Sequence, residues 1–242
     1  MNHQSIDIKE VSGVQDIISN SKSKLLLGKV IASAVNTVLA PKSTTGVIDR
    51  GTHLEVGGWK VSKDCLGEPT LPKGEIEINE QANKKKPQAW SYLIDKNTIS
   101  HDEKYHGFEL WKRIFPWFEN MSMNEAEAQG LFPVTIWEYN YEGAKKEIEY
   151  RGQYLPSQVE LLRMINSVSG NCIEKAKALR LPFAGYCRAG YSELTLAGFT
   201  MLLWTSLSGG VCLHRGNDRV DVGRKYHGHG ALVRSFLDNK RT

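Results

Sequence analysis

The spacing of hydrophobic and polar positions changes several times along the chain. Residues 5–21 and 22–40 carry apolar side chains at mixed intervals, and the second run fits either one helix or two strands. From Gly46 to Asn79, short β-prone pieces alternate with Gly, Pro and Asp, which predicts a small β-rich section. We therefore expect an N-terminal section over residues 1–88, either separate from or integral to a domain over residues 89–242.

Aromatic residues then gather in residues 90–99 and 108–118. Such a cluster suits a stacking platform for bases or sugars, but a large mixed core is the preferred interpretation because aromatic side chains supply much buried area. Residues 122–130 are typical of a short acidic helix or loop. The run from Val134 to Tyr139 predicts a strand.

The clearest local signal lies at Ser157, which is followed three residues later by Glu160. This spacing is a capping box, in which each side chain satisfies a backbone N–H of the first helical turn. We expect a helix to begin here and to place Leu161, Leu162 and Ile165 on one face.

From Leu181 to Phe236, short β-prone pieces are separated by glycines. The sequence thus predicts an α+β protein whose last quarter is mostly strands and turns. Alternation assigns one set of side chains in this part to an invariant core: Leu181, Phe183, Leu194, Trp204, Leu213, Val220, Val222, Leu232, Val233 and Phe236.

Composition narrows the classes of function. The 242 residues are 40% hydrophobic and 24% charged, the net charge is +4, and Lys84 to Lys86 form one short basic run. This composition is ordinary for a globular protein, and the positive charge is too small to indicate nucleic-acid binding. We expect neither a secretory signal nor membrane insertion, because the N-terminus is interrupted by charges and no window is apolar enough.

Candidate chemistry is sparse. The four cysteines, Cys65, Cys172, Cys187 and Cys212, show no C-x-x-C spacing, and no nucleophile triad or phosphate-binding loop occurs. His227 and His229 occupy alternate positions and would point to one face of a strand, but they lack a third nearby ligand in a recognisable pattern. We expect no metal, no cofactor and no catalytic residue.

Four phrases occur in order in the C-terminal part: "LPSQVELLRMI", "LPFAGY", "LAGFTMLLWTS" and "HGALVRSF". This series resembles the C-terminal half of bacterial and viral proteins with a C-type lectin-like fold, related to formylglycine-generating enzymes. The resemblance covers about residues 151–238. It implies a C-type lectin-like fold for the C-terminal domain. A catalytic cysteine pair would have only Cys187 and Cys212 as candidates, without a supporting motif.

One subset of this group is the variable proteins of diversity-generating retroelements, whose C-terminal repeat is rewritten at template adenines. Randomising both adenines of an AAC or AAT codon never yields Lys, Glu, Gln, Met or Trp. From Thr205 to Asn239 this excluded set occurs once, as Lys225, whereas the preceding 204 residues hold 54, so roughly nine would be expected. The alternative explanation is a glycine-rich β segment that disfavours long side chains, and we favour diversification.

The resemblance implies a non-enzymatic protein that displays a diversified surface. Its expected partner is a protein or another macromolecule on a target surface, and the expected location is a virion surface or a product exported by a non-classical route. The alternative is an undiversified lectin-like module that binds carbohydrate or serves as a structural subunit. Arg215 and Asp218 are also expected to be exposed. The predicted ligand-binding residues are Cys187, Tyr191, Phe199, Leu202, Val211, Cys212, His214, Asn217, Arg219, Asp221, Arg224, Tyr226, His227 and His229.

Overall fold

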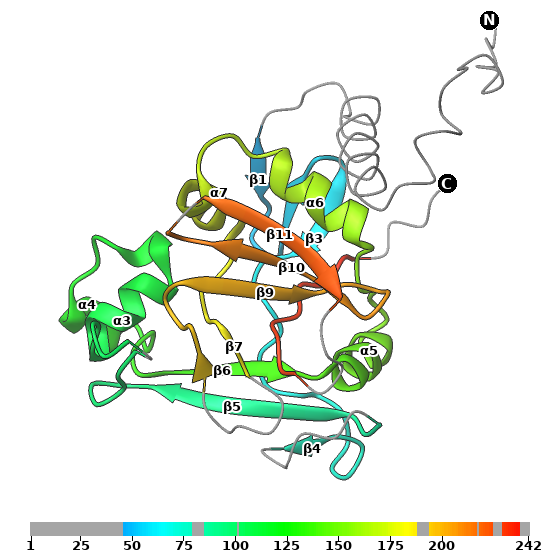
Figure 1. Cartoon of the computed structure of the whole chain (residues 1–242), viewed down its shortest axis with the longest axis horizontal. Helices are drawn as coiled ribbons and strands as arrows, with labels where there is room; N and C mark the ends of the chain where they lie inside the picture. Colours follow the sequence, from blue (N-terminus) through cyan, green and yellow to red (C-terminus); the bar gives the residue numbers. More distant parts are fainter. Residues whose placement is uncertain are drawn as a thin grey trace, which may run out of the picture. The chain divides into compact units, whose positions relative to one another are not determined.

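The computed structural model describes residues 46–78, 85–100, 102–187, 194–216, 218–224 and 229–237. They belong to one compact unit that begins at Thr44. The unit contains both helices and sheets, as the prediction of an α+β protein requires (Figure 1). The predicted features within residues 5–40 lie outside the described residues.

The first sheet confirms the short β-prone pieces expected after Gly46. Its antiparallel strands are β1 (Val47–Asp49), β2 (His53–Val56) and β3 (Trp59–Ser62). Val61 of β3 bridges to Phe236, and the Ser62 N–H donates to the carbonyl of Ser235 at 2.9 Å. The described part of the N-terminal section is therefore integral to the same unit as the end of the chain.

The second sheet contains β4 (Glu77–Ile78), β5 (Gln88–Ile94) and β6 (Val134–Tyr139), in that order. The strand expected from Val134 to Tyr139 is confirmed. Between β5 and β6 the chain forms three helices: α3 (Gly107–Ile114), η2 (Pro116–Phe118) and α4 (Met123–Ala128).

The aromatic cluster largely serves the core, as preferred from the sequence. The rings of Trp111 and Phe118 are stacked with centroids 5.1 Å apart, and Phe108 stacks on Trp111 at 4.9 Å. Trp111 is 1% exposed. Offset ring pairs of this kind stabilise beyond the area they bury.

Three further helices follow β6: α5 (Tyr141–Tyr150), α6 (Gln158–Asn166) and α7 (Cys172–Leu179). The capping box before α6 is confirmed, since the Glu160 N–H donates to Ser157 Oγ at 3.2 Å and the Ser157 N–H donates to Glu160 Oε2 at 2.8 Å. Leu161 and Ile165 are buried, while Leu162 packs at the margin of the core.

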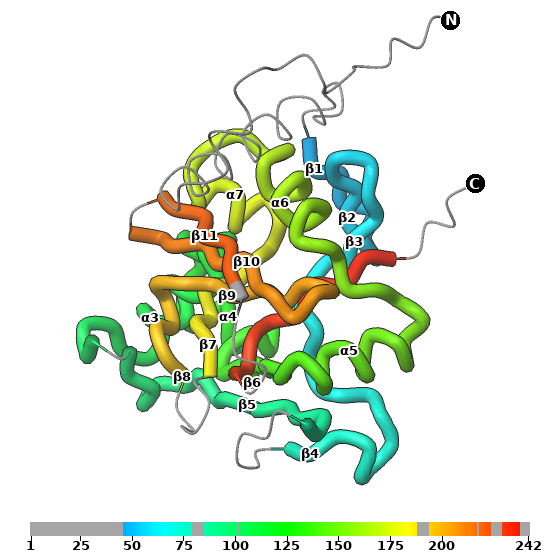
Figure 2. Tube along the Cα trace, turned by 45° about the vertical axis from the view of Figure 1, so that its right-hand side comes forward, coloured from blue at the N-terminus to red at the C-terminus, as the bar shows by residue number. Residues whose placement is uncertain are grey.

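The third sheet is antiparallel with the order β11-β10-β9, and a short hairpin, β7-β8, lies nearby. Figures 1 and 2 show the red C-terminal segment passing from the end of β6 toward β3, in agreement with the bridges of Ala231 to Tyr139 and of Phe236 to Val61. We call residues 231–236 the closing run; within it, Leu232 bridges to Leu203 in parallel. The bounds are β7 Tyr186–Cys187, β8 Leu194–Thr195, β9 Thr200–Trp204, β10 Gly209–His214 and β11 Arg219–Arg224.

Hydrophobic clusters cover both sides of strands β9 and β10. One cluster contains Val211 and Leu213, and the other contains Cys212 and Trp204. Within the second cluster, the indole N–H of Trp204 donates to the carbonyl of Tyr139 at 2.6 Å. The middle of this sheet is therefore buried on both faces.

The predicted core is correct at most positions. Leu194 and Val220 are half-buried, and the prediction for Val222 is wrong because its residue is 39% exposed on the outer strand β11. The remaining predicted core residues are buried: Leu181, Phe183, Trp204, Leu213, Leu232, Val233 and Phe236. Across the described ranges, no helix is long and apolar enough to span a bilayer.

Candidate functional site

Strand register determines which of the predicted ligand-binding side chains share a face. His214 lies opposite Thr200 on one neighbour and Arg219 on the other, and Cys212 lies opposite Leu202 and Asp221. Directly opposed residues, and those two positions apart, point to the same side of a sheet. His214, Arg219 and Asp221 therefore occur on one face at the outer edge of the sheet.

These three side chains form an ionic cluster. Nε2 of His214 lies 3.1 Å from Oδ2 of Asp221, and Nε of Arg219 contacts Oδ1 of the same carboxylate. Their side chains are 29%, 66% and 34% exposed for His214, Arg219 and Asp221 respectively. Exposed pairs of this kind contribute little to stability, so the three residues are available to a ligand at small cost to the fold.

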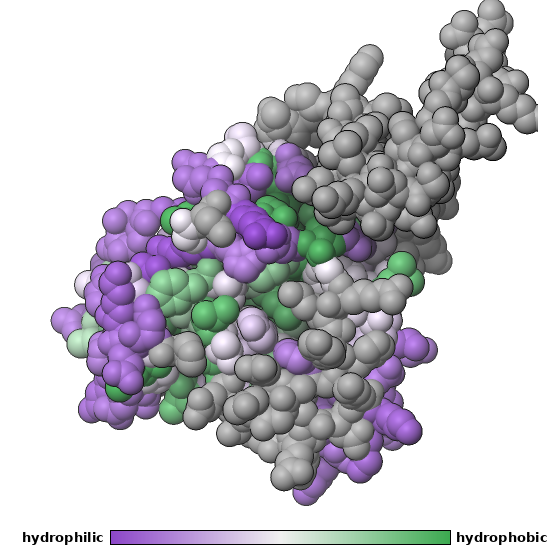
Figure 3. Space-filling model, in the orientation of Figure 1, coloured by the Kyte–Doolittle hydropathy of each residue, from purple (hydrophilic) through white to green (hydrophobic). Residues whose placement is uncertain are grey.

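The space-filling view shows the surroundings of this cluster. Hydrophilic residues gather over β11, and hydrophobic residues lie beside them over the middle of the sheet (Figure 3). Interfaces commonly combine an apolar centre with a polar margin. We call His214, Arg219 and Asp221 the outer-strand surface; the exposed Val222 is the next residue of β11 and, opposite Val211, points to the other face of the sheet.

The turn between β10 and β11 is tied to α7. Asp218 adopts a left-handed backbone conformation with φ 53°, and its Oδ1 accepts a hydrogen bond from the Cys172 N–H in the first turn of the helix. The pKa of Asp218 is lowered, first by a hydrogen bond from the Cys172 side chain and then by this N–H. Asp218 is exposed as expected, but it also positions the hairpin.

Four predicted ligand-binding residues are buried, and the expectation that they face outward is wrong. The exposed fraction is 0% for Cys187, 1% for Leu202, 0% for Val211 and 4% for Cys212. Leu202 lies on β9, and Val211 and Cys212 lie on β10; core clusters cover both faces of these two strands. Alternation identifies opposite faces but does not show whether each face meets solvent.

The remaining predicted residues have mixed positions. Phe199 is half-buried with its ring 5.8 Å from that of Tyr105, and His229 is half-buried with its ring 6.0 Å from that of Tyr186. The Arg224 backbone pairs with Gly209 in β11. Four predicted residues lie outside the described residues: Tyr191, Asn217, Tyr226 and His227.

A buried carboxyl group that the sequence did not reveal lies beneath this region. Glu138 on β6 is 0% exposed, and its Oε2 accepts the Cys187 N–H at 2.6 Å. Burial raises the pKa of Glu138 from 4.5 to about 8, although the bond from Cys187 opposes this shift. A Cβ on Gly230 would lie 3.0 Å from Oε2 and 2.8 Å from the Cys187 Cβ, so only glycine fits this crossing.

Arg234 is a second buried ionisable residue that sequence reasoning assigned no role. Its guanidinium is 0% exposed and donates to the carbonyl of Lys63 at 2.7 Å and to the carbonyl of Leu179. Burial lowers the pKa of Arg234. The side chain thereby joins the closing run to the segment after β3 and to the end of α7.

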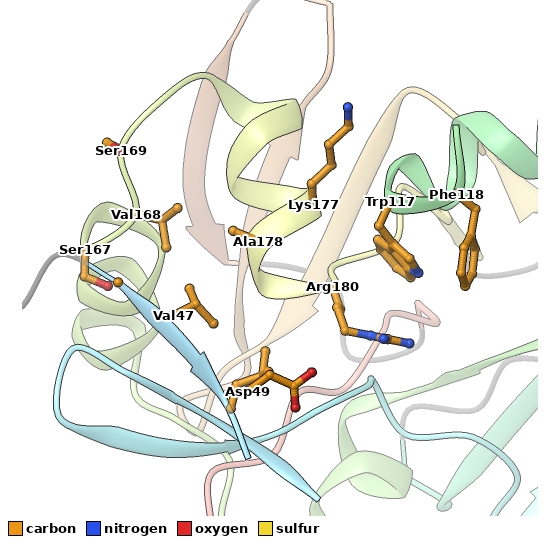
Figure 4. A pocket seen from close by; sticks show the side chains of 12 residues that line it. Val47, Asp49, Trp117, Phe118, Ser167, Val168, Ser169, Lys177, Ala178 and Arg180 are labelled. Atoms are coloured by element: carbon orange, nitrogen blue, oxygen red, sulfur yellow. The ribbon is translucent and has the colours of Figure 1, made fainter. Parts of the chain in front are cut away.

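A hollow of about 620 Å³ lies on another part of the unit, between β1, η2 and α7 (Figure 4). In Figure 4, Trp117 and Arg180 approach each other at one side of it, and Asp49 lies below. Its charged groups already have partners, since Arg180 Nε lies 3.0 Å from Asp64 and Asp49 lies 2.7 Å from Lys63. These pairs leave the hollow without an evident reactive group.

Metal ligands do not converge in the part of the chain that the structure describes, where no group of three His, Cys, Asp or Glu residues is placed to hold an ion. Burial raises the pKa of the Cys172 thiol to about 11 and raises that of Cys187, which disfavours the reactive thiolate. The arrangement offers a binding surface more readily than a nucleophile.

No family model matches the chain, and comparisons with curated proteins and with solved structures found no match.

Proposed function

We propose that this chain is a non-enzymatic binding protein that presents side chains of its C-terminal sheet to a macromolecular target, and that these side chains are diversified by a retroelement. The fold proposed for the C-terminal part is C-type lectin-like. Its support is the ordered series of phrases, which cover most of α6, the approach to β7, all of β9 and the closing run.

The observation that carries the proposal is the residue set of the exposed outer strand. Lys, Glu and Gln ordinarily occupy exposed positions. Between Thr205 and Arg224, none of them occurs, although residues such as Leu207, Arg219 and Val222 are exposed. Burial accounts for their absence from β10 but not from β11 and its turn. A restricted set of codons accounts for both.

The architecture also supports a division between constant and variable positions. The first core cluster packs beneath β10 and includes Leu161 of α6 and Phe236 of the closing run. The side chains of Arg219 and Asp221 project from the opposite, outer margin. Substitutions there leave the core contacts in place, so a changing surface is compatible with one stable fold.

The genetic part of this proposal is tested in the DNA around the gene. We expect a reverse transcriptase and an imperfect repeat of the region encoding about Cys187 to Phe236 that differs at adenines. Codons of the AAC or AAT series, or their adenine-derived products, should encode His214, Arg219 and Asp221. A locus without such a repeat would remove diversification from the proposal.

The protein part is tested with a library in which the codons of His214, Arg219 and Asp221 are randomised together. We expect most members to remain folded and protease-resistant, because these side chains form exposed contacts. A matched library at Val211, Leu213 and Trp204 should lose most folded members. Equal losses in both libraries would contradict the division between constant and variable positions.

A further inference from the structure

The corner where α3 approaches the sheet brings two arginines together. Arg113 lies near the end of α3, and Arg215 follows β10 directly. The Arg215 N–H donates to the carbonyl of Phe199 at 2.9 Å, and its Nη1 donates to the carbonyl of Arg113 at 2.6 Å. In Figure 1 this corner lies at the left, where α3 lies beside the ends of β9 and β10.

Aromatic rings lie close to both guanidinium groups. The Cζ of Arg113 lies 3.9 Å from the ring centre of Tyr105 and 5.0 Å from that of Phe199. The Cζ of Arg215 lies 5.7 Å from the ring centre of Phe183. Stacking of this kind uses the faces of a guanidinium and leaves its N–H edge for hydrogen bonds.

Neither cation is neutralised within the described part of the chain. Arg113 and Arg215 form no ion pair there, and the buried Nε of Arg113 has no acceptor. Glu119, which influences Arg215, pairs with Lys177. Burial and the neighbouring Arg113 both lower the pKa of Arg215. Two partly buried like charges without a counter-charge are unfavourable, and an anion would relieve the repulsion.

We propose that Arg113 and Arg215 form a binding site for an oxyanion: a carboxylate, sulfate or phosphate group. Each guanidinium carries a planar fork of N–H donors, the geometry that binds such groups with charge-assisted hydrogen bonds. The site is next to the outer-strand surface in sequence only: Arg215 follows His214 directly, and consecutive residues along a strand point to opposite faces. Of its two residues, Arg113 belongs to α3, outside the segment proposed to be diversified, and Arg215 lies inside that segment.

The direct test titrates the full chain with sodium sulfate at constant ionic strength by calorimetry. We expect saturable binding in the wild type and affinity at least about tenfold weaker in Arg113→Gln and Arg215→Gln, the factor for one lost charge-assisted bond. Lys112→Gln is the matched control, since it removes one positive charge from the same helix, where Lys112 pairs with Glu109 at 2.7 Å. Its affinity should stay within about twofold of the wild type.

Arg215→Lys keeps the charge without the fork, and we expect it to weaken sulfate binding while leaving the fold intact. This variant keeps the test decisive if Arg215→Gln does not fold. Absence of saturable sulfate binding, or equal weakening in Lys112→Gln and Arg215→Lys, would overturn the proposal. The second result would indicate a general effect of net charge.

A second arm distinguishes a free anion from one carried by a polymer. Dextran sulfate should compete with inorganic sulfate, whereas neutral dextran should not. Competition that is lost in Arg113→Gln supports a macromolecule-borne ligand at this corner. Competition retained unchanged in Arg113→Gln would overturn the assignment to this pair. Arg219→Ala should bind sulfate like the wild type, so failure of the outer-strand surface and failure of this site remain distinguishable.

Discussion

Strands β10 and β11 are neighbours in one sheet, yet they meet different environments. Val211, Cys212 and Leu213 of β10 are covered on both faces, whereas Arg219 and Val222 of β11 are exposed. Both strands lack Lys, Glu, Gln, Met and Trp. Burial explains the absence of these residues from β10 but not from the exposed β11, which would need a second cause. A codon restriction explains their absence from both strands.

The largest effect should come from the buried side of this comparison. We expect Trp204→Ala to lower the free energy of unfolding by about 3 to 5 kcal/mol, because it leaves a large cavity and removes a donor from the Tyr139 carbonyl. Urea denaturation measures the difference. Leu207→Ala is the control, since Leu207 is 81% exposed, and its change should stay below about 0.5 kcal/mol.

Arg234→Ala should have the next largest effect and lower the free energy of unfolding by about 3 kcal/mol. It leaves the carbonyls of Lys63 and Leu179 without their buried donor and also creates a cavity. Arg50→Ala provides a surface comparison, since Arg50 is 52% exposed and pairs with Glu55. Similar denaturation midpoints for the two variants would show that the closing run is not held by Arg234.

Glu138 predicts a dependence on pH with a definite sign. Between 4.5 and about 8, the folded protein retains a proton that the unfolded chain has lost, so stability should fall as pH rises through this window. The contribution is at most about 1.4 kcal/mol per pH unit. Denaturation of Glu138→Gln at several pH values should show a flatter profile than the wild type.

Glu147→Gln is the matched control for this titration. The pKa of Glu147 is lowered, because bonds from Thr70 and Arg151 outweigh its burial. The stability that ionised Glu147 contributes is present at neutral pH and is lost as pH falls below the ordinary carboxyl range. This pH dependence is opposite in direction to the one expected for Glu138. If Glu138→Gln keeps the wild-type slope between pH 5 and 8, Glu138 does not hold the extra proton.

The smallest effect should come from the exposed side. Arg219→Ala should change the free energy of unfolding by less than about 0.5 kcal/mol, since its contact with Asp221 is solvent-screened. His214→Ala should behave similarly, and thermal melting measures both. A loss approaching that of Trp204→Ala would place the outer strand in the structural core and contradict the comparison.

Local signals in the sequence predicted local structure well. The capping box at Ser157 depends on residues three positions apart, and the structure contains it. The strand from Val134 to Tyr139 was also predictable from its side chains. The burial of both faces of β10 could not be predicted, because it depends on α6 and on the closing run, which are distant from β10 in sequence.

The buried polar contacts show the same limit. Glu138 and Cys187 are 49 positions apart, and Arg234 donates to a carbonyl 171 positions away. A single sequence gives no signal for such pairings, since each residue type is also common in unrelated settings. The arginine pair was missed for this reason too: Arg113 and Arg215 become neighbours only when α3 meets the sheet.

The closing run limits where heritable variation is tolerable. Its backbone pairs with β3 and with β9, and Arg234 fixes it from within. Within the repeat that extends to Phe236, substitutions after Gly230 would replace buried side chains of the closing run and cost stability. Faithful copying should therefore resume by the codon of Ala231, so that the hypervariable part of the gene ends where the closing run of the protein begins.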